Sequence, residues 1–221
     1  EEATTKLADV RELRSQLDAN GLTVVATHGG WTTDDSFDAV LDQIETLGTT
    51  RLIAPAPGTI SGHGDALKSL DGVKRFAEAL NWSAERAESR GIRIGYHNHD
   101  FEWKELEDGT PAYDALVAAL DPRVFLEVDL YWVYSAGLVP ADVVTQYADR
   151  VELLHVKDGP GGHVDQVPVG QGSVDNVAGI EAGVNVDYAI IELDGCKGDP
   201  YDAALAGAQW LVDNEYATWR A

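Results

Sequence analysis

Short apolar runs rich in β-branched residues alternate along this chain with amphipathic stretches of helical period, and this alternation limits the fold most strongly. The predicted strands cover residues 22–29, 49–58, 92–99, 124–132, 151–158 and 187–195. The predicted helices cover residues 3–20, 37–47, 65–90, 111–120, 140–147, 174–182 and 200–212. Nearly continuous apolar strands separated by helices are typical of a parallel sheet covered on both faces.

Such a sheet either stays open and doubly wound or closes into a (β/α)8 barrel. No GxGxxG motif follows the first predicted strand, so the main indicator of an open nucleotide-binding sheet is missing. The length of 221 residues predicts one domain over residues 1–221, with a sizeable core.

The net charge of −22, from 38 acidic and 16 basic residues, disfavours nucleic acid and anionic membranes as partners. The acidic residues are spread along the chain and lysine is scarce, which is typical of proteins from a high-salt cytoplasm. We therefore expect a cytoplasmic protein of an extreme halophile. No apolar run approaches the length of a membrane span, and the first residues show no signal-peptide pattern. Cys196 is the single cysteine, so no intramolecular disulfide can form.

Four consecutive predicted strands end in side chains that bind metals or transfer protons. These are His97, His99 and Glu102 at the end of the third strand, Asp129 in the fourth, His155, Lys157 and Asp158 in the fifth, and Glu192 in the sixth. In a barrel, the carboxyl ends of all strands meet at one face, where active sites form. Each residue alone has a structural alternative, because a histidine there is often structural and an acidic residue often caps the next helix. Buried unpaired charges are costly, so four such strands in a row favour a shared metal site.

Carboxylate and imidazole groups without a cysteine ligand suit Mn²⁺, Mg²⁺, Co²⁺ or Zn²⁺.

The runs that carry a family resemblance are YHNHDFEW, LEVDLYWVYSAG, RVELLHVKDG, VPVGQGSVD and AIIELDG, the last followed by Asp199-Pro200. Together they resemble the xylose isomerase-like TIM barrels of the sugar phosphate isomerase/epimerase superfamily, from about residue 21 to the end. The resemblance implies an eight-stranded α/β barrel with one catalytic divalent ion at its C-terminal face.

In that family two glutamates, one aspartate and one histidine typically hold the ion. The resemblance places the aspartate at Asp129, the histidine at His155 and the second glutamate at Glu192. For the first glutamate two readings stay open. Either Glu102 folds back to the ion while a histidine serves as base or substrate contact, or His97 or His99 replaces the glutamate as ligand. We favour Glu102.

The resemblance also implies eight strands, whereas the sequence shows six. We therefore expect that the first one or two strand–helix units, roughly 30 to 45 residues before Glu1, are missing from this chain. The predicted fold class is thus an N-terminally incomplete (β/α)8 TIM barrel.

The chemistry implied by the resemblance is proton abstraction next to a carbonyl, through an enediolate stabilised by the metal. Glu192 and Glu102 would form the acid/base pair, with His97 or His99 as an alternative base. Asp129 and His155 would hold the ion.

Three further residues are candidate contacts to a small sugar or keto-polyol. Lys157 follows His155 on the same strand face and would bind a substrate oxygen, while Trp132 would supply an apolar wall or simply pack. His163 lies in the loop GPGGHVDQVPVGQG, which would cover the site or remain a solvated loop.

The outcome of the reaction is left open by the sequence. Proton return gives a sugar isomerase or epimerase, whereas expulsion of a β-hydroxyl gives a dehydratase or lyase on keto-sugars or keto-inositols.

An apurinic endonuclease with three zinc ions fits less well, because the chain has few histidines outside the cluster and no basic face. A non-catalytic sugar-binding barrel is also less favoured, since a whole candidate metal shell is present. A homo-oligomer is compatible with the sequence.

Overall fold

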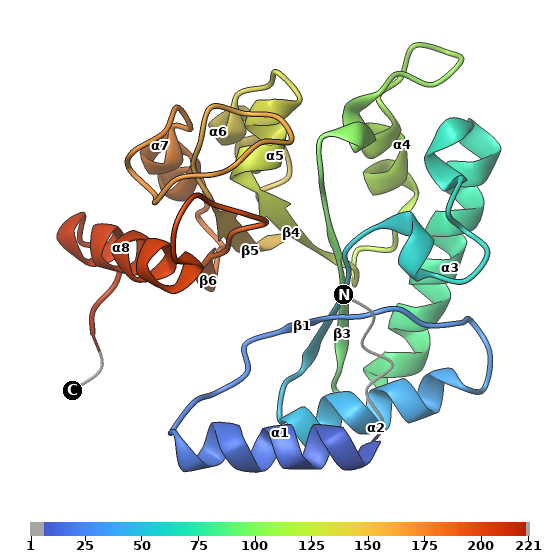
Figure 1. Cartoon of the computed structure of the whole chain (residues 1–221). Helices are drawn as coiled ribbons and strands as arrows, with labels where there is room; N and C mark the ends of the chain where they lie inside the picture. Colours follow the sequence, from blue (N-terminus) through green and yellow to red (C-terminus); the bar gives the residue numbers. More distant parts are fainter. Residues whose placement is uncertain (1–6, 220–221) are drawn as a thin grey trace. The chain divides into compact units, whose positions relative to one another are not determined.

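The computed structural model describes residues 7–219, which form two compact units (Figure 1). The described part of the first unit comprises residues 7–97 and 102–125, and that of the second comprises residues 98–101 and 126–219. Each unit contributes three consecutive strands, and the pairs described within each unit are parallel. The six strands and their parallel pairing confirm the predicted α/β class.

The first unit contains the strands β1 (Thr27–His28), β2 (Arg51–Ala54) and β3 (Arg93–His97). Its helices are α1 (Leu7–Ala19), α2 (Phe37–Leu47), α3 (Leu70–Glu88) and α4 (Ala112–Ala119), with short 3-10 turns at Pro57–Thr59 and Ala66–Lys68. β2 lies between β1 and β3, and in the register of the strands Leu52 is the partner of both Thr27 and Ile94. Helix α1 packs beside α2, and α3 packs beside α4.

The α2 helix shows how the sequence determines one of these elements. Phe37, Leu41 and Ile44 recur at helical spacing and are all buried, so one face of the helix packs into the core. Gly48 ends the helix in the left-handed conformation, with a φ of 76°, and its N–H donates to the carbonyl of Glu45. Glycine adopts this conformation without the steric cost that other residues incur.

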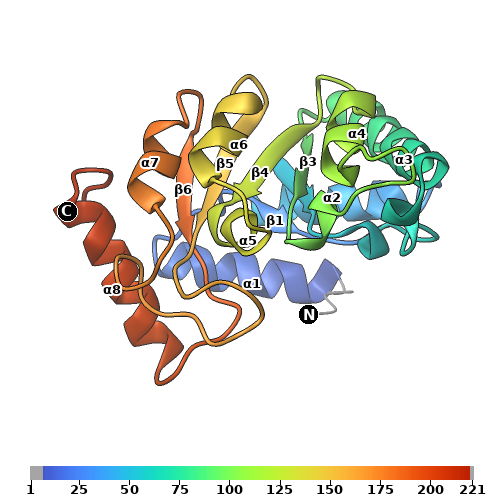
Figure 2. The same cartoon turned by 90° about the horizontal axis from the view of Figure 1, so that it is seen from above.

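The second unit contains β4 (Phe125–Asp129) from Leu126 onwards, β5 (Val151–Val156) and β6 (Tyr188–Ile191). Its helices are α5 (Leu130–Ser135), α6 (Pro140–Gln146), α7 (Asn176–Glu181) and α8 (Pro200–Asp213). β5 lies between β4 and β6, and Asp129 is the register partner of His155. Helices α6 and α7 lie side by side, as Figure 2 shows from above.

Several predicted elements differ from the structure. The stretch Leu130–Trp132 was expected to continue the fourth strand, but it begins α5, because the Asp129 side chain caps a helix at this point. β3 ends at His97, so the strand predicted over residues 92–99 is shorter and His99 lies outside it. The first predicted strand is reduced to Thr27–His28, and residues 3–6 of the first predicted helix lie outside the described residues.

The described helices are too short or too polar to cross a membrane. The longest described helix, α3, has 19 residues and carries charged residues along its exposed side. Its apolar residues instead pack into the first unit, where Val73, Phe76 and Leu80 are fully buried.

The large negative charge predicts that stability depends on salt. Raising KCl from about 0.1 M to about 2 M shortens the screening length and weakens the repulsion among the 38 acidic groups. We expect the melting temperature to rise by about 5–10 °C. Differential scanning calorimetry measures this change, with sucrose as an uncharged control solute. A melting temperature that does not change with KCl would contradict the predicted halophilic adaptation.

Candidate metal and substrate site

Three predicted metal ligands converge in the second unit. Asp129 ends β4, His155 lies near the end of β5, and Glu192 directly follows β6. One ligand atom from each lies within 4.8 Å of the other two, and His155 Nδ1 is 3.3 Å from Glu192 Oε2. The carboxyl ends of adjacent parallel strands share one edge, so these residues meet although 63 positions separate the first from the last. Two carboxylates and one imidazole at this spacing fit a divalent ion.

Asp129 serves two purposes at once. Its Oδ1 accepts the backbone N–H of Trp132 at 2.9 Å and so caps α5, while its Oδ2 faces His155 Nδ1 at 3.8 Å. The backbone N–H of Asp129 donates to Asn98 Oδ1 at 3.0 Å. Burial raises the pKa of Asp129 to about 6, although Lys157 and His155 act in the opposite direction. The helix-cap role and the site role therefore coexist in one residue.

Glu127 is a member of the site that the sequence interpretation missed. Its Oε1 lies 3.2 Å from His155 Nε2, and the carboxylate is buried. A carboxylate on one ring nitrogen orients a metal-binding histidine so that the other nitrogen faces the ion. Burial alone would lower the pKa of His155, but the hydrogen bonds to Glu127 and Glu192 outweigh it and raise the pKa to about 10. The sequence offered one signal for Glu127. It lies two residues before Asp129 in the same strand, and residues two apart in a strand share a face.

Lys157 places a buried ammonium group among the acidic residues. Its side chain is 1% exposed, and Nζ lies 3.0 Å from Asp129 Oδ2, 2.8 Å from Asp194 Oδ2 and in close contact with Glu192 Oε2. Burial opposes the charge of Lys157, but Asp129 and Glu192 overcome that effect and raise its pKa. Burial also raises the pKa of Glu192, yet His155 and Lys157 dominate and lower it to about 2. The three carboxylates around Lys157 therefore stabilise the positive charge of its ammonium group.

Asp158 organises the glycine-rich loop that follows β5. Its two carboxylate oxygens accept four backbone N–H groups, at 2.8–3.1 Å, from Gly159, Gly170, Gly172 and Val174. A Cβ at residue 172 would lie 2.2 Å from Asp158 Oδ1, so only glycine fits there without rearrangement. The loop is therefore fixed to the end of the strand that carries His155 and Lys157.

The same loop also supports Asp194, a second residue that the sequence interpretation missed. Gln166 Nε2 donates to Asp194 Oδ2 at 2.8 Å, and the Asp194 N–H donates to Gln166 Oε1 at 2.9 Å. Gln166 is buried. This reciprocal pair holds the Asp194 carboxylate beside the ammonium group of Lys157.

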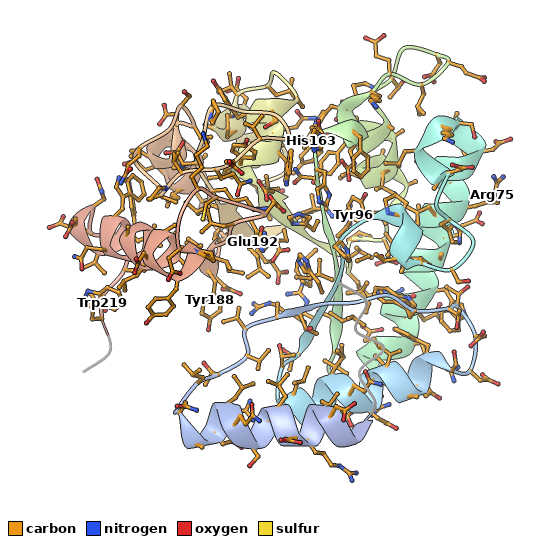
Figure 3. The ribbon with its side chains drawn as sticks, viewed as in Figure 1. Arg75, Tyr96, His163, Tyr188, Glu192 and Trp219 are labelled. Carbon is orange, nitrogen blue, oxygen red and sulfur yellow. The ribbon has the colours of Figure 1, made fainter. Side chains whose placement is uncertain are left out.

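The three predicted substrate contacts lie together in the second unit. The Trp132 ring centre is 4.8 Å from that of His163 and 5.6 Å from that of His99, and Lys157 Nζ lies 5.8 Å from the Trp132 ring. His163, labelled with Glu192 in Figure 3, is largely exposed, and its Nε2 lies 3.1 Å from Asp100 Oδ2. Burial, followed by the charge of Lys157, lowers the pKa of His99. The rings of Trp132, His99 and His163 thus form an aromatic surface beside the ammonium group of Lys157.

His97 and Glu102 belong to the first unit. Glu102 is fully buried, and its Oε1 accepts a hydrogen bond from the hydroxyl of Tyr96 at 2.9 Å. The Tyr96 ring packs edge-on against Phe76 of α3, on the strand face opposite to His97. The ring of His97 lies 5.0 Å from that of His28. The roles of His97 and Glu102 as ligand or base stay predictions.

The fold and the site place the chain in a known family. Residues 2–212 match the family model of the xylose isomerase-like TIM barrel, and the chain belongs to this family. An inosose dehydratase of Clostridium beijerinckii is 25% identical over 167 residues, which cover 68% of this chain and 55% of that protein. The chain thus matches just over half the length of this relative.

Solved structures show the same fold. A sugar phosphate isomerase/epimerase from Parabacteroides distasonis superposes with a TM-score of 0.79 at 21% identity, over 95% of this chain and 79% of that one. The IOLI protein, solved with a bound zinc atom, has a TM-score of 0.64 at 16% identity, over 98% and 88% of the two chains.

Proposed function

We propose that this protein is a divalent-metal-dependent sugar isomerase or epimerase that abstracts a proton next to a carbonyl. The observation that carries the proposal is the convergence of Asp129, His155 and Glu192 at the carboxyl ends of three consecutive strands. Family membership and the enzymes among the similar proteins support it. The substrate class that we propose is a small sugar or keto-polyol.

Asp129, His155 and Glu192 would hold the ion, which we propose to be Mn²⁺, Mg²⁺, Co²⁺ or Zn²⁺. When bound, such an ion polarises a substrate carbonyl as a Lewis acid. Glu102 stays our predicted fourth ligand, with His97 or His99 as the alternative.

We propose the remaining roles for the other candidate residues. Glu192 and Glu102 would form the acid/base pair that moves the proton, with His97 or His99 as an alternative base. The lowered pKa of His99 leaves its imidazole neutral at pH 7, as a base requires. Lys157 binds a substrate oxygen, and Trp132 offers the apolar face against which a sugar ring packs.

A dehydratase or lyase is the second candidate, favoured by the similarity to the inosose dehydratase over 68% of this chain. The initial proton abstraction is the same. The enediolate then expels a β-hydroxyl group instead of taking the proton back, so one molecule of water is lost for each substrate consumed.

Incubation with keto-sugars and keto-inositols in D₂O at molar salt tests the proposal. We expect deuterium at the carbon next to the carbonyl, and no deuterium after the ion has been removed with a chelator. Nuclear magnetic resonance separates the outcomes, because isomers and epimers keep all oxygen atoms whereas a dehydrated product loses one. Lack of exchange with every sugar tried would contradict the proposal and favour a sugar-binding or nuclease function.

A further inference from the structure

We infer that Lys157 is an internal cation that competes with the divalent ion for Asp129 and Glu192, and that Asp194 is the alternative partner of its ammonium group. The inference rests on the metal site proposed above and concerns how that site is regulated. It predicts that Lys157 weakens metal binding instead of assisting it.

The first step is that the ammonium and the ion would share the same oxygen atoms. Asp129 Oδ2 and Glu192 Oε2 both face His155 Nδ1, and these same two oxygens contact Lys157 Nζ. A divalent ion held by these oxygens would lie next to the ammonium, and like charges at such short range in a buried site repel strongly. Binding of the ion is therefore expected to displace Nζ.

The second step is that the displaced ammonium has a second acceptor already in place. Asp194 Oδ2 lies 2.8 Å from Nζ and is not one of the three clustered ligands. The reciprocal hydrogen bonds with buried Gln166 fix the Asp194 carboxylate independently of Lys157. Lys157 can thus give up its contacts with Asp129 and Glu192 while keeping one ion pair.

The third step explains why such a cation is useful. Without an ion, Asp129 and Glu192 would place two carboxylates close together, one of them fully buried. An uncompensated buried charge destabilises a fold, and Lys157 helps to compensate it through its contacts with both carboxylates. The same displacement links occupancy of the ion to an ammonium that is free to bind a substrate oxygen.

Metal affinity tests the inference without reference to activity. Isothermal titration with Mn²⁺ compares the wild type with Lys157→Met and Lys157→Arg at constant pH and salt. Lys157→Met is expected to bind Mn²⁺ at least about tenfold more tightly, because the competing charge is gone. Lys157→Arg keeps the charge and is the matched control, with an affinity close to that of the wild type.

A double variant, Lys157→Met with Asp194→Asn, preserves the net charge of the cluster and covers the case in which the single variant does not fold. It is also expected to bind Mn²⁺ more tightly than the wild type. Equal or weaker binding by folded Met variants overturns the inference but leaves the metal site intact. If neither the wild type nor any variant binds Mn²⁺, the proposed metal-dependent function fails as well.

Discussion

Replacing His155 with alanine is expected to abolish stoichiometric binding of a divalent ion. The imidazole is the only nitrogen donor in the cluster of Asp129, His155 and Glu192, and its Nδ1 faces both carboxylates. Its removal leaves two oxygen donors from this cluster beside a competing ammonium. Elemental analysis and titration of the purified variant measure the result, which we expect to be a loss of affinity larger than 100-fold.

Two further variants give this experiment a graded control. Glu127→Gln keeps the shape of the side chain but weakens the partner that orients His155, so affinity is expected to fall about 10- to 100-fold. His163→Ala removes an exposed histidine of the same unit and should leave metal content unchanged. If His155→Ala and His163→Ala retain the same metal content, the ion is bound elsewhere.

Asp158→Asn is expected to lower the free energy of unfolding by about 2–4 kcal/mol. In the wild type, each carboxylate oxygen of Asp158 accepts two backbone N–H groups. The substitution replaces one of these oxygens with an amide NH₂. Donors would then face donors in a buried position, and the loop over residues 159–174 would lose its anchor. Denaturant titration at molar salt measures the change, and hydrogen exchange at Gly170, Gly172 and Val174 locates it.

Asp165→Asn is the matched control for this prediction. The same substitution is made in the same loop, but Asp165 is exposed, and we expect a change within about 0.5 kcal/mol. A loss of less than about 1 kcal/mol in Asp158→Asn would mean that the loop does not depend on these four hydrogen bonds.

Much of the architecture follows from periodicity in the sequence. Helix α2 was predicted at residues 37–47 and spans Phe37–Leu47, because its apolar residues and the terminal glycine give consistent signals. The stretch Leu130–Trp132 was assigned wrongly because it is apolar throughout and fully or nearly fully buried. Such a run has no period that separates strand from helix, and the capping alternative noted for the acidic residues was the signal for a helix start at Asp129.

The candidate site was predictable only in part. Strand ends identify which residues can meet, and this was enough to bring Asp129, His155 and Glu192 together. Glu127 was missed because the sequence does not show which side chain a carboxylate inside an apolar strand will contact. Its contact with His155 becomes visible only in the structure. Asp194 was missed because its position depends on Gln166, which comes from a long loop without periodicity.

The two roles of Asp129 have a mechanical consequence. Its Oδ1 accepts a hydrogen bond from the first turn of α5. Its Oδ2 faces His155 in the cluster of Asp129, His155 and Glu192. A shift of this carboxylate is expected to move the backbone of Trp132, whose N–H donates to it at 2.9 Å. The position of the Trp132 ring is thus expected to depend on whether the cluster holds an ion.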